Sequence, residues 1–153
     1  MKKLIGILIL GLLFSSPSLS NSLKVIDGDT IVLNGEKIRF SGIDTPELKQ
    51  TCLKDNEKVG CGMLAKKLLV NKIGNNTPIC IGKKKDFYKR TLAECFVNGE
   101  SLSVYMVKNG YAFDYAKYSK KKYEEHENFA KKNNLGLWKT KFEYPWVWRK
   151  KNR

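Results

Sequence analysis

The chain has 153 residues and a formal net charge of +14, a length that fits one domain. The excess of basic residues favours polyanionic partners, namely nucleic acid, anionic lipid or acidic polysaccharide, although charge alone says nothing about chemistry. Beyond residue 20 no apolar stretch is long enough to cross a bilayer, which excludes a multispanning membrane protein.

The N-terminus has the pattern of a secretory signal peptide. Lys2 and Lys3 precede an apolar run over residues 4–14, and small residues follow up to Ser20. An uncleaved anchor is the alternative, but Pro17 interrupts a run that is already shorter than the roughly 20 residues that a spanning helix needs. We therefore expect residues 1–20 to be removed on export to the periplasm or the exterior. The remaining domain, residues 21–153, would carry no membrane anchor.

Three short β-type runs open this domain, at residues 24–26, 30–33 and 37–40. Asn34-Gly35 lies between two of them and is a strong signal for a hairpin turn. The pattern predicts an antiparallel meander over residues 24–43. The polar segment 48–60 that follows is expected to be an exposed loop.

The rest of the chain alternates helix and strand signals. Apolar residues at helical spacing predict a helix over residues 62–73. Two strands, 78–81 and 91–97, are expected to pair across a basic turn, and two more helices are expected at 100–109 and 120–133. Five short strands with about three helices indicate an α+β fold that is mainly β, and a five-stranded OB-fold barrel is the commonest such design that binds nucleic acid.

Four cysteines, an even number in a small exported domain, indicate disulfides. Three pairings are possible, and we favour Cys52–Cys61 and Cys80–Cys95. The first would tie the ends of the polar loop, and the second would join residues that fall nearly opposite each other on paired strands. A zinc site is a weaker alternative, because the chain has no C-x-x-C pair and a single histidine.

Candidate metal ligands and catalytic carboxylates lie at strand ends, where a barrel can bring loops together. Asp29 and Asp44 with a nearby backbone carbonyl would form an oxygen-only site suited to Ca²⁺, and Glu47 lies close by. Taken alone, the Asp27-Gly28-Asp29 segment is also typical of an ordinary turn.

Two arginines are candidates for binding phosphate, Arg39 and Arg90. A guanidinium can hold a phosphate through two hydrogen bonds and stabilise charge that grows in a transition state. Among the aromatic residues, Tyr118 and, with less support, Tyr88 are expected to stack on bases, whereas the others are expected to pack in the core.

These segments resemble the signature segments of the staphylococcal nuclease family. The resemblance rests on four stretches and on their order: Val25–Thr30, Ile38–Phe40, Gly42–Glu47 and Asp86-x-Tyr88-x-Arg90. It extends through the weaker matches Gly110–Ala112, Tyr118 and Gly136–Trp138.

The resemblance implies an OB-fold barrel with three helices and a calcium-dependent nuclease that cleaves DNA and RNA and leaves 3′-phosphates. It implies that Asp29, Asp44 and the Thr45 carbonyl hold Ca²⁺. Glu47 would orient or deprotonate the attacking water, and Arg39 and Arg90 would bind the phosphate. The implied protein is a monomer that needs no stable protein partner.

The sequence departs from the family pattern in the cysteines, in the aromatic and basic tail, and at Lys89, where glycine is usual. An OB-like module that binds nucleic acid without cleaving it is the main alternative function. A basic exported protein that binds membranes or polysaccharide is a third, and it would show no dependence on metal.

Overall fold

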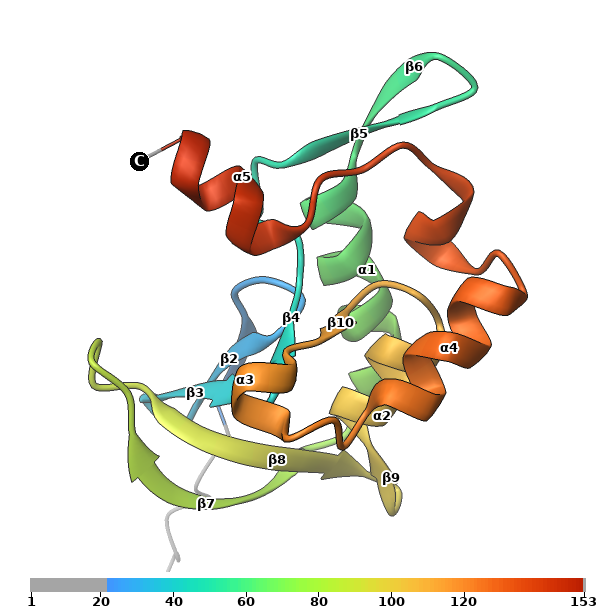
Figure 1. The fold of residues 1–153 in the computed structure, drawn as a ribbon. Helices are drawn as coiled ribbons and strands as arrows, with labels where there is room; N and C mark the ends of the chain where they lie inside the picture. The colour runs from blue at the N-terminus through green and yellow to red at the C-terminus, as the bar shows by residue number, and fades with distance from the viewer. Residues whose placement is uncertain (1–21, 153) are drawn as a thin grey trace, which may run out of the picture.

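A curved mixed sheet forms the base of the molecule in the computed structural model, which describes residues 22–152 (Figure 1). Its strands follow the order β1–β2–β3–β8–β7, with the bounds Leu23–Val25, Thr30–Leu33, Glu36–Phe40, Thr91–Val97 and Ile79–Lys85. The β3–β8 pair is parallel and the other pairs along this path are antiparallel. This is the strand order of a partly open OB barrel, so the predicted fold class is confirmed. The expected signal peptide, residues 1–20, lies outside the described residues.

The predicted meander forms because its turn residues and its buried residues both favour the same antiparallel pairing. Asn34 and Gly35 adopt positive φ angles of 51° and 81°, as the tight turn between β2 and β3 requires. Ile31, Ile38 and Phe40 project from the two strands into the core and are almost completely buried. The register of the β2–β3 pair and the burial of these side chains therefore fix the position of β3, the strand that carries Arg39.

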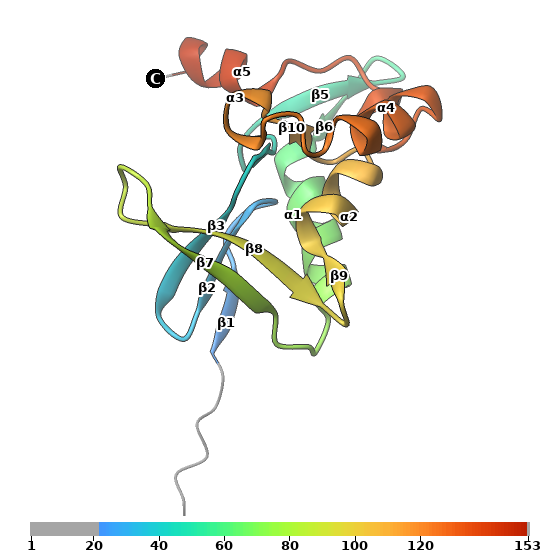
Figure 2. The ribbon, with the colours of Figure 1, turned by 60° about the horizontal axis from the view of Figure 1, so that its bottom comes forward.

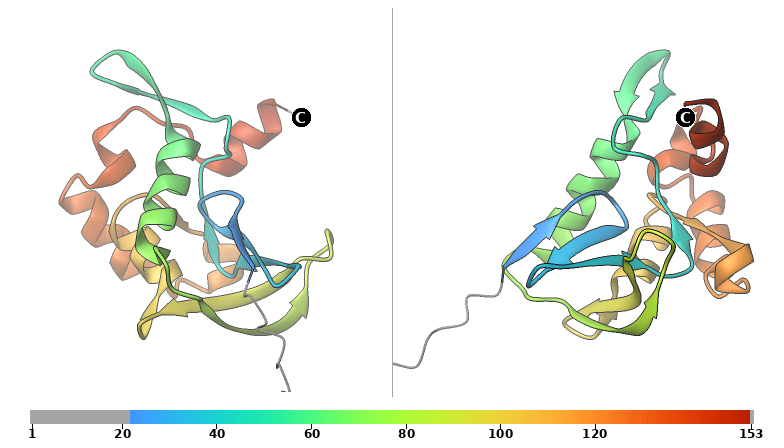
Figure 3. Two further views of the ribbon diagram at one scale, coloured as in Figure 1. Left: turned by 180° about the vertical axis from the view of Figure 1, so that it is seen from behind. Right: turned by 90° about the vertical axis from the view of Figure 1, so that its left-hand side faces the viewer.

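The helix α1, Cys61–Ile73, covers the sheet and connects it to the opposite end of the molecule (Figure 3). Ala65, Leu69 and Ile73 repeat every four residues and are fully buried, which gives the helix one apolar face. The predicted helix is therefore confirmed. The next helix expected from sequence is α2, Leu102–Lys108, which follows the two-residue strand β9, Glu100–Ser101.

The polar segment 48–60 was expected to be a loop, and that prediction was wrong. It forms a two-stranded hairpin of β5, Thr51–Lys54, and β6, Glu57–Gly60. Asp55 and Asn56 both have positive φ and make the two-residue turn. The hairpin lacks the alternation of apolar and polar residues that marks a half-buried strand, because most of its side chains are exposed.

The helix expected at 120–133 is shorter than predicted and begins later, as α4, Glu124–Lys132. Lys120 and Lys121 have positive φ angles of 55° and 67°, so the backbone there turns and cannot continue a right-handed helix. A short helix, α3, Ala116–Ser119, precedes this turn.

The C-terminal segment folds back over the far end of the molecule. The 3₁₀ helix η1, Gly136–Lys139, leads through an extended stretch to α5, Pro145–Lys151, which lies beside β5 and away from β7 and β9 (Figures 1 and 2). The short strands β4, Ile43–Asp44, and β10, Phe113–Asp114, pair below it. Within residues 22–152, no helix is both long and apolar enough to cross a membrane.

Both predicted disulfides are confirmed. Cys52 and Cys61 lie with their Cα atoms 5.8 Å apart and link β5 to the start of α1. Cys80 and Cys95 are direct register partners on β7 and β8, with Cα atoms 4.0 Å apart. One bond therefore ties the hairpin to the helix that it precedes, and the other ties two strands of the barrel.

Removing the Cys80–Cys95 bond should lower the free energy of unfolding by about 3 kcal/mol, because the bond closes a loop of about 15 residues in the unfolded chain. Denaturant unfolding of a Cys80→Ala/Cys95→Ala variant would measure the loss. Adding a reductant to this variant then reports on Cys52–Cys61 alone. An unchanged midpoint in the double variant would mean that the bond contributes no stability.

Candidate active site

The site begins at the turn between β1 and β2. Asp27 accepts a hydrogen bond from the Asp29 N–H at 3.1 Å, so this segment does form the turn that its sequence is typical of. Asp29 is nevertheless 2% exposed, and its side chain points into the molecule, where the Thr30 hydroxyl donates to it. The turn therefore delivers one carboxylate to a buried position.

Arg39 lies next to this carboxylate because β2 and β3 are in register. Thr30 is the register partner of Arg39, which places Asp29 one residue beyond it. The guanidinium donates from Nη1 to Asp29 Oδ1 at 2.7 Å and from Nη2 to Asp44 Oδ1 at 2.8 Å. The two carboxylates thus sit at the two ends of one planar fork.

The segment after β4 is fixed by its neighbours. The Thr45 N–H donates to Asp29 Oδ2 at 3.2 Å, which ties the β4 end to the β1–β2 turn. The Glu47 N–H donates to the buried Gln50 side chain. Gly62, at the start of α1, touches the Glu47 backbone so closely that a Cβ atom there would lie 1.9 Å from the Glu47 carbonyl oxygen. A glycine is therefore required for this segment to reach its place.

Asp29 and Arg39 are both buried, and burial acts against the charge of each. Burial raises the pKa of Asp29 from 3.8 to about 6, although the positive charge of Arg39 acts in the opposite direction. Burial also opposes the charge on Arg39, but Asp29 and Asp44 outweigh this and raise the pKa of its guanidinium. Burial and the neighbouring opposite charges therefore act against each other at both groups.

A second arginine, Arg149 on α5, reaches the same carboxylates. Its Nη2 donates to Asp44 Oδ2 at 2.7 Å, and its Nη1 donates to Asp44 Oδ1 at 3.1 Å and to Glu47 Oε1 at 2.8 Å. Asp44 is fully buried, whereas Glu47 is 38% exposed in its side chain. Five side chains therefore form one charged network: Asp29, Arg39, Asp44, Glu47 and Arg149.

Sequence reasoning missed Arg149, which lies more than 100 residues from its partners in the chain. A signal was nevertheless present, because only four of the 29 basic residues are arginines. Three of the four, at positions 39, 90 and 149, are largely buried in ion pairs with carboxylates. In this chain most basic residues are lysines, and arginine occurs where a planar guanidinium can donate two hydrogen bonds to carboxylates.

Arg90 lies outside this network of contacts. It is held by Asp86, which accepts from Arg90 Nε at 2.7 Å, and its guanidinium lies 5.4 Å from the Tyr88 ring centroid. Lys89, in the position where glycine was expected, adopts a left-handed φ of 62°. The hairpin therefore keeps a glycine-like turn without glycine.

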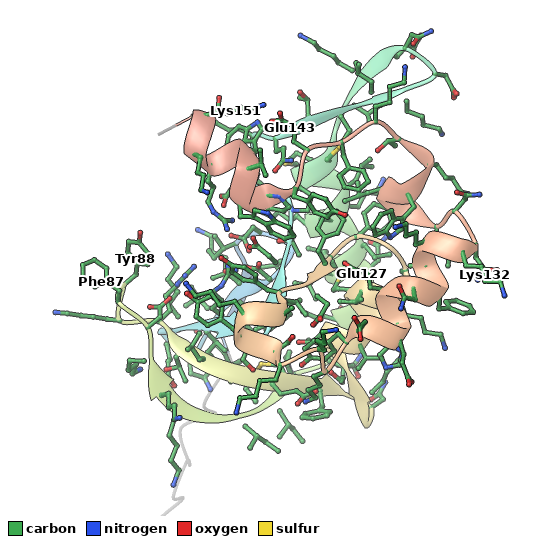
Figure 4. All side chains as sticks on the ribbon, in the orientation of Figure 1. Phe87, Tyr88, Glu127, Lys132, Glu143 and Lys151 are labelled. Atoms are coloured by element: carbon green, nitrogen blue, oxygen red, sulfur yellow. A yellow bond between two sulfur atoms is a disulfide. The ribbon has the colours of Figure 1, made fainter. Side chains whose placement is uncertain are left out.

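The expected base-stacking residues are accessible. Phe87 and Tyr88 project from the tip of the β7–β8 hairpin, and Tyr88 is 66% exposed (Figure 4). Tyr118, on α3, is 63% exposed, and its ring centroid lies 4.9 Å from that of Tyr115. Tyr123, in contrast, is 1% exposed and belongs to the core.

The donors around the site fit a hard divalent cation. Asp29 and Asp44 have carboxylate oxygens, and Thr45, the residue after Asp44, adds a backbone carbonyl. Across residues 22–152 no group of three or more His, Cys, Asp or Glu side chains is arranged to hold a metal ion. Such a cation would therefore rest on two side chains, on backbone oxygen and on ligands from outside the protein.

The fold and the site together define a small, partly open OB barrel with a buried carboxylate–arginine cluster at one end, an architecture that binds oligonucleotides or oligosaccharides in other proteins. The model of the staphylococcal nuclease homologue family matches residues 37–140, which is more than half of the chain. The chain belongs to the staphylococcal nuclease family.

Curated relatives agree with this membership. The succinoglycan biosynthesis protein ExoI of Rhizobium meliloti is 30% identical over 79% of this chain and 65% of its own length. The staphylococcal-like nuclease CAN1 of Arabidopsis thaliana is 32% identical over 76% of this chain and 34% of its own. An uncharacterized endonuclease of Haemophilus influenzae is 31% identical over 75% and 63%. The chain thus spans between a third and two thirds of these relatives' lengths.

Proposed function

We propose that the protein is an exported, calcium-dependent nuclease that hydrolyses phosphodiester bonds of DNA and RNA and leaves 3′-phosphates. The observation that carries the proposal is the pair of buried carboxylates, Asp29 and Asp44, at the two ends of the Arg39 guanidinium. Family membership supports it, and so do relatives that are named as nucleases.

Asp29, Asp44 and the Thr45 carbonyl would hold the calcium ion. Bound there, the cation would supply a Lewis acid that polarises the phosphate and offsets the charge that grows on its oxygens. Three carboxylates face two guanidiniums in this network, so one negative charge is left over for such a cation to offset.

The protein side chains bind the phosphate, activate the water and hold the bases. Arg39 and Arg90 bind the phosphate oxygens through paired hydrogen bonds and stabilise the five-coordinate arrangement of the reacting phosphorus. Glu47, the most exposed carboxylate of the cluster, orients a water molecule for in-line attack and accepts its proton. Tyr118 and Tyr88 stack on bases without reading sequence.

The partner of this site is nucleic acid, and its cofactor is Ca²⁺. The basic surface, including the exposed lysines 83–85 and 120–122, attracts the phosphate backbone without sequence preference. The two disulfides suit an oxidising compartment outside the cytosol, in agreement with the proposed export. The enzyme acts as a monomer.

Cleavage of single-stranded DNA and RNA by the purified protein, with Ca²⁺ and with a chelator, tests this function. We expect cleavage in Ca²⁺, no cleavage in the chelator, and recovery when Ca²⁺ is added back. Analysis of the product ends should find 3′-phosphates. Binding without cleavage, in a folded sample supplied with Ca²⁺, would instead favour a nucleic-acid-binding module without catalytic activity.

A further inference from the structure

The C-terminal helix is joined to the site by contacts that form a continuous support. Lys141 pairs with Leu53 of β5 through two backbone hydrogen bonds of 2.8 and 3.0 Å. The buried Gln50 side chain then donates to the Glu143 carbonyl at 2.7 Å. The segment that leads into α5 is therefore attached to the same stretch of chain that positions Glu47.

Aromatic stacking fixes the start of α5. The Trp146 ring lies nearly parallel to Tyr144, with centroids 4.6 Å apart, and nearly parallel to Tyr115, with centroids 5.5 Å apart. Pro145 begins the helix and is buried. Figure 4 shows α5 with Lys151 beside Glu143, its ion-pair partner. The helix is thus held in one orientation, and Arg149 projects from it toward the carboxylates.

The contacts of Arg149 use the oxygens that a metal ion would need. Asp44 Oδ2 accepts a hydrogen bond from Arg149, and Asp44 Oδ1 accepts from both Arg149 and Arg39. A guanidinium and a divalent cation cannot both take Asp44 Oδ2 without bringing like charges together. The three carboxylates of the network face two guanidiniums, so a cation that replaces Arg149 at Asp44 gains a more negative site.

We propose that Arg149 is an internal counter-cation of the active site, which also pairs with Glu47, competes with the divalent metal ion for Asp44 and thereby sets the metal affinity. This inference rests on the proposed metal-dependent function and adds its regulation. Arg149 stabilises the metal-free site and gives up Asp44 when the cation binds. The helix α5 stays anchored by its aromatic stack, so the guanidinium remains close to the site.

Calorimetric titration with Ca²⁺ of the wild-type protein and of Arg149→Met tests the proposal. The methionine keeps much of the side-chain length but removes the charge and the donors. We expect Arg149→Met to bind Ca²⁺ about tenfold more tightly, which corresponds to about 1.4 kcal/mol. Arg149→Lys keeps the charge but loses the planar fork, so its affinity should lie between the two.

Lys150→Met is the matched control, because Lys150 is exposed on the same helix and carries the same charge. Its Ca²⁺ affinity should change much less than that of Arg149→Met. Melting temperatures provide a second readout. In chelator, Arg149→Met should melt below the wild type, whereas its gain in melting temperature on adding Ca²⁺ should be larger.

Three outcomes would overturn the proposal in distinguishable ways. Unchanged or weaker Ca²⁺ binding by Arg149→Met, in a protein whose wild type binds Ca²⁺ and cleaves DNA, would reject the competition and leave the nuclease function standing. An equal gain in Ca²⁺ affinity in Lys150→Met would mean that the loss of one positive charge anywhere on α5, and not the Arg149 contact, explains the effect. Absence of Ca²⁺ binding in the wild type and in both Arg149 variants would reject the metal-dependent function together with this inference. If Arg149→Met does not fold, Arg149→Lys carries the comparison.

Discussion

Replacing Asp44 by alanine should abolish calcium binding and nucleic-acid cleavage together. Asp44 is fully buried and accepts hydrogen bonds from both Arg39 and Arg149. Loss of a residue that merely supports a metal ligand costs about 10–100-fold in metal affinity. Loss of a direct ligand should cost at least about 100-fold. Titration with Ca²⁺ and a cleavage assay on the same preparation would measure both effects.

Two further variants make the Asp44 result specific. Glu125→Ala removes one negative charge from an exposed position of α4 and should leave both readouts unchanged. Asp44→Asn preserves the shape of the side chain and one hydrogen-bond acceptor for the guanidiniums, so it leaves a smaller packing defect than alanine. Both Asp44 variants remove one partner of a buried ion pair, which can destabilise a protein by about 3–5 kcal/mol, so circular dichroism must first show that each is folded. Full cleavage by a folded Asp44→Asn variant would move the metal site away from this cluster.

The sequence was most informative where structure depends on neighbouring residues. The turn at Asn34-Gly35 and the inward alternation of Ile38 and Phe40 follow from local backbone geometry and from burial on one face. The Cys80–Cys95 pairing followed in turn from the strand register. In such segments the local sequence pattern favours the same structure as the folded surroundings, so periodicity and turn residues are enough to predict it.

The errors lie where contacts are distant in the chain. Most side chains of the β5–β6 hairpin are exposed and only Cys52 is buried, so the apolar–polar alternation is too short to detect, and the hairpin pairs with the distant C-terminal residue Lys141. The tail reads only as aromatic and basic until the fold stacks Trp146 on Tyr115 and brings Arg149 to Asp44. Local propensity carries no information about such long-range pairs.

The candidate site shows the same division. The motif residues Asp29, Arg39, Asp44 and Glu47 were predicted as site residues, and the structure places them in one network. Their roles remain predictions. What the motif could not indicate is that a fifth residue, Arg149, supplies the second guanidinium on these carboxylates. Arg90, which the motif did indicate, contacts Asp86 instead.

Replacing Arg39 by alanine should slow cleavage by about 10²–10³-fold while calcium binding is retained or strengthened. Removal of one donor that stabilises developing charge typically has an effect of this size on the chemical step. The change also removes a positive charge that lies 2.7 Å from Asp29 and 2.8 Å from Asp44, so the metal loses a competitor for these carboxylates. Single-turnover cleavage at saturating Ca²⁺, beside a calcium titration, separates the two effects.

The control for Arg39 is Lys37→Ala, because Lys37 lies two residues earlier on the same face of β3 and is exposed. It should cleave at close to the wild-type rate. Arg39→Lys should recover only part of the lost rate, since an ammonium cannot reproduce the planar fork that bridges two acceptors. Undiminished turnover in Arg39→Ala would remove this residue from the mechanism. A parallel loss of calcium binding would instead mean that Arg39 acts by holding Asp29 and Asp44 in place.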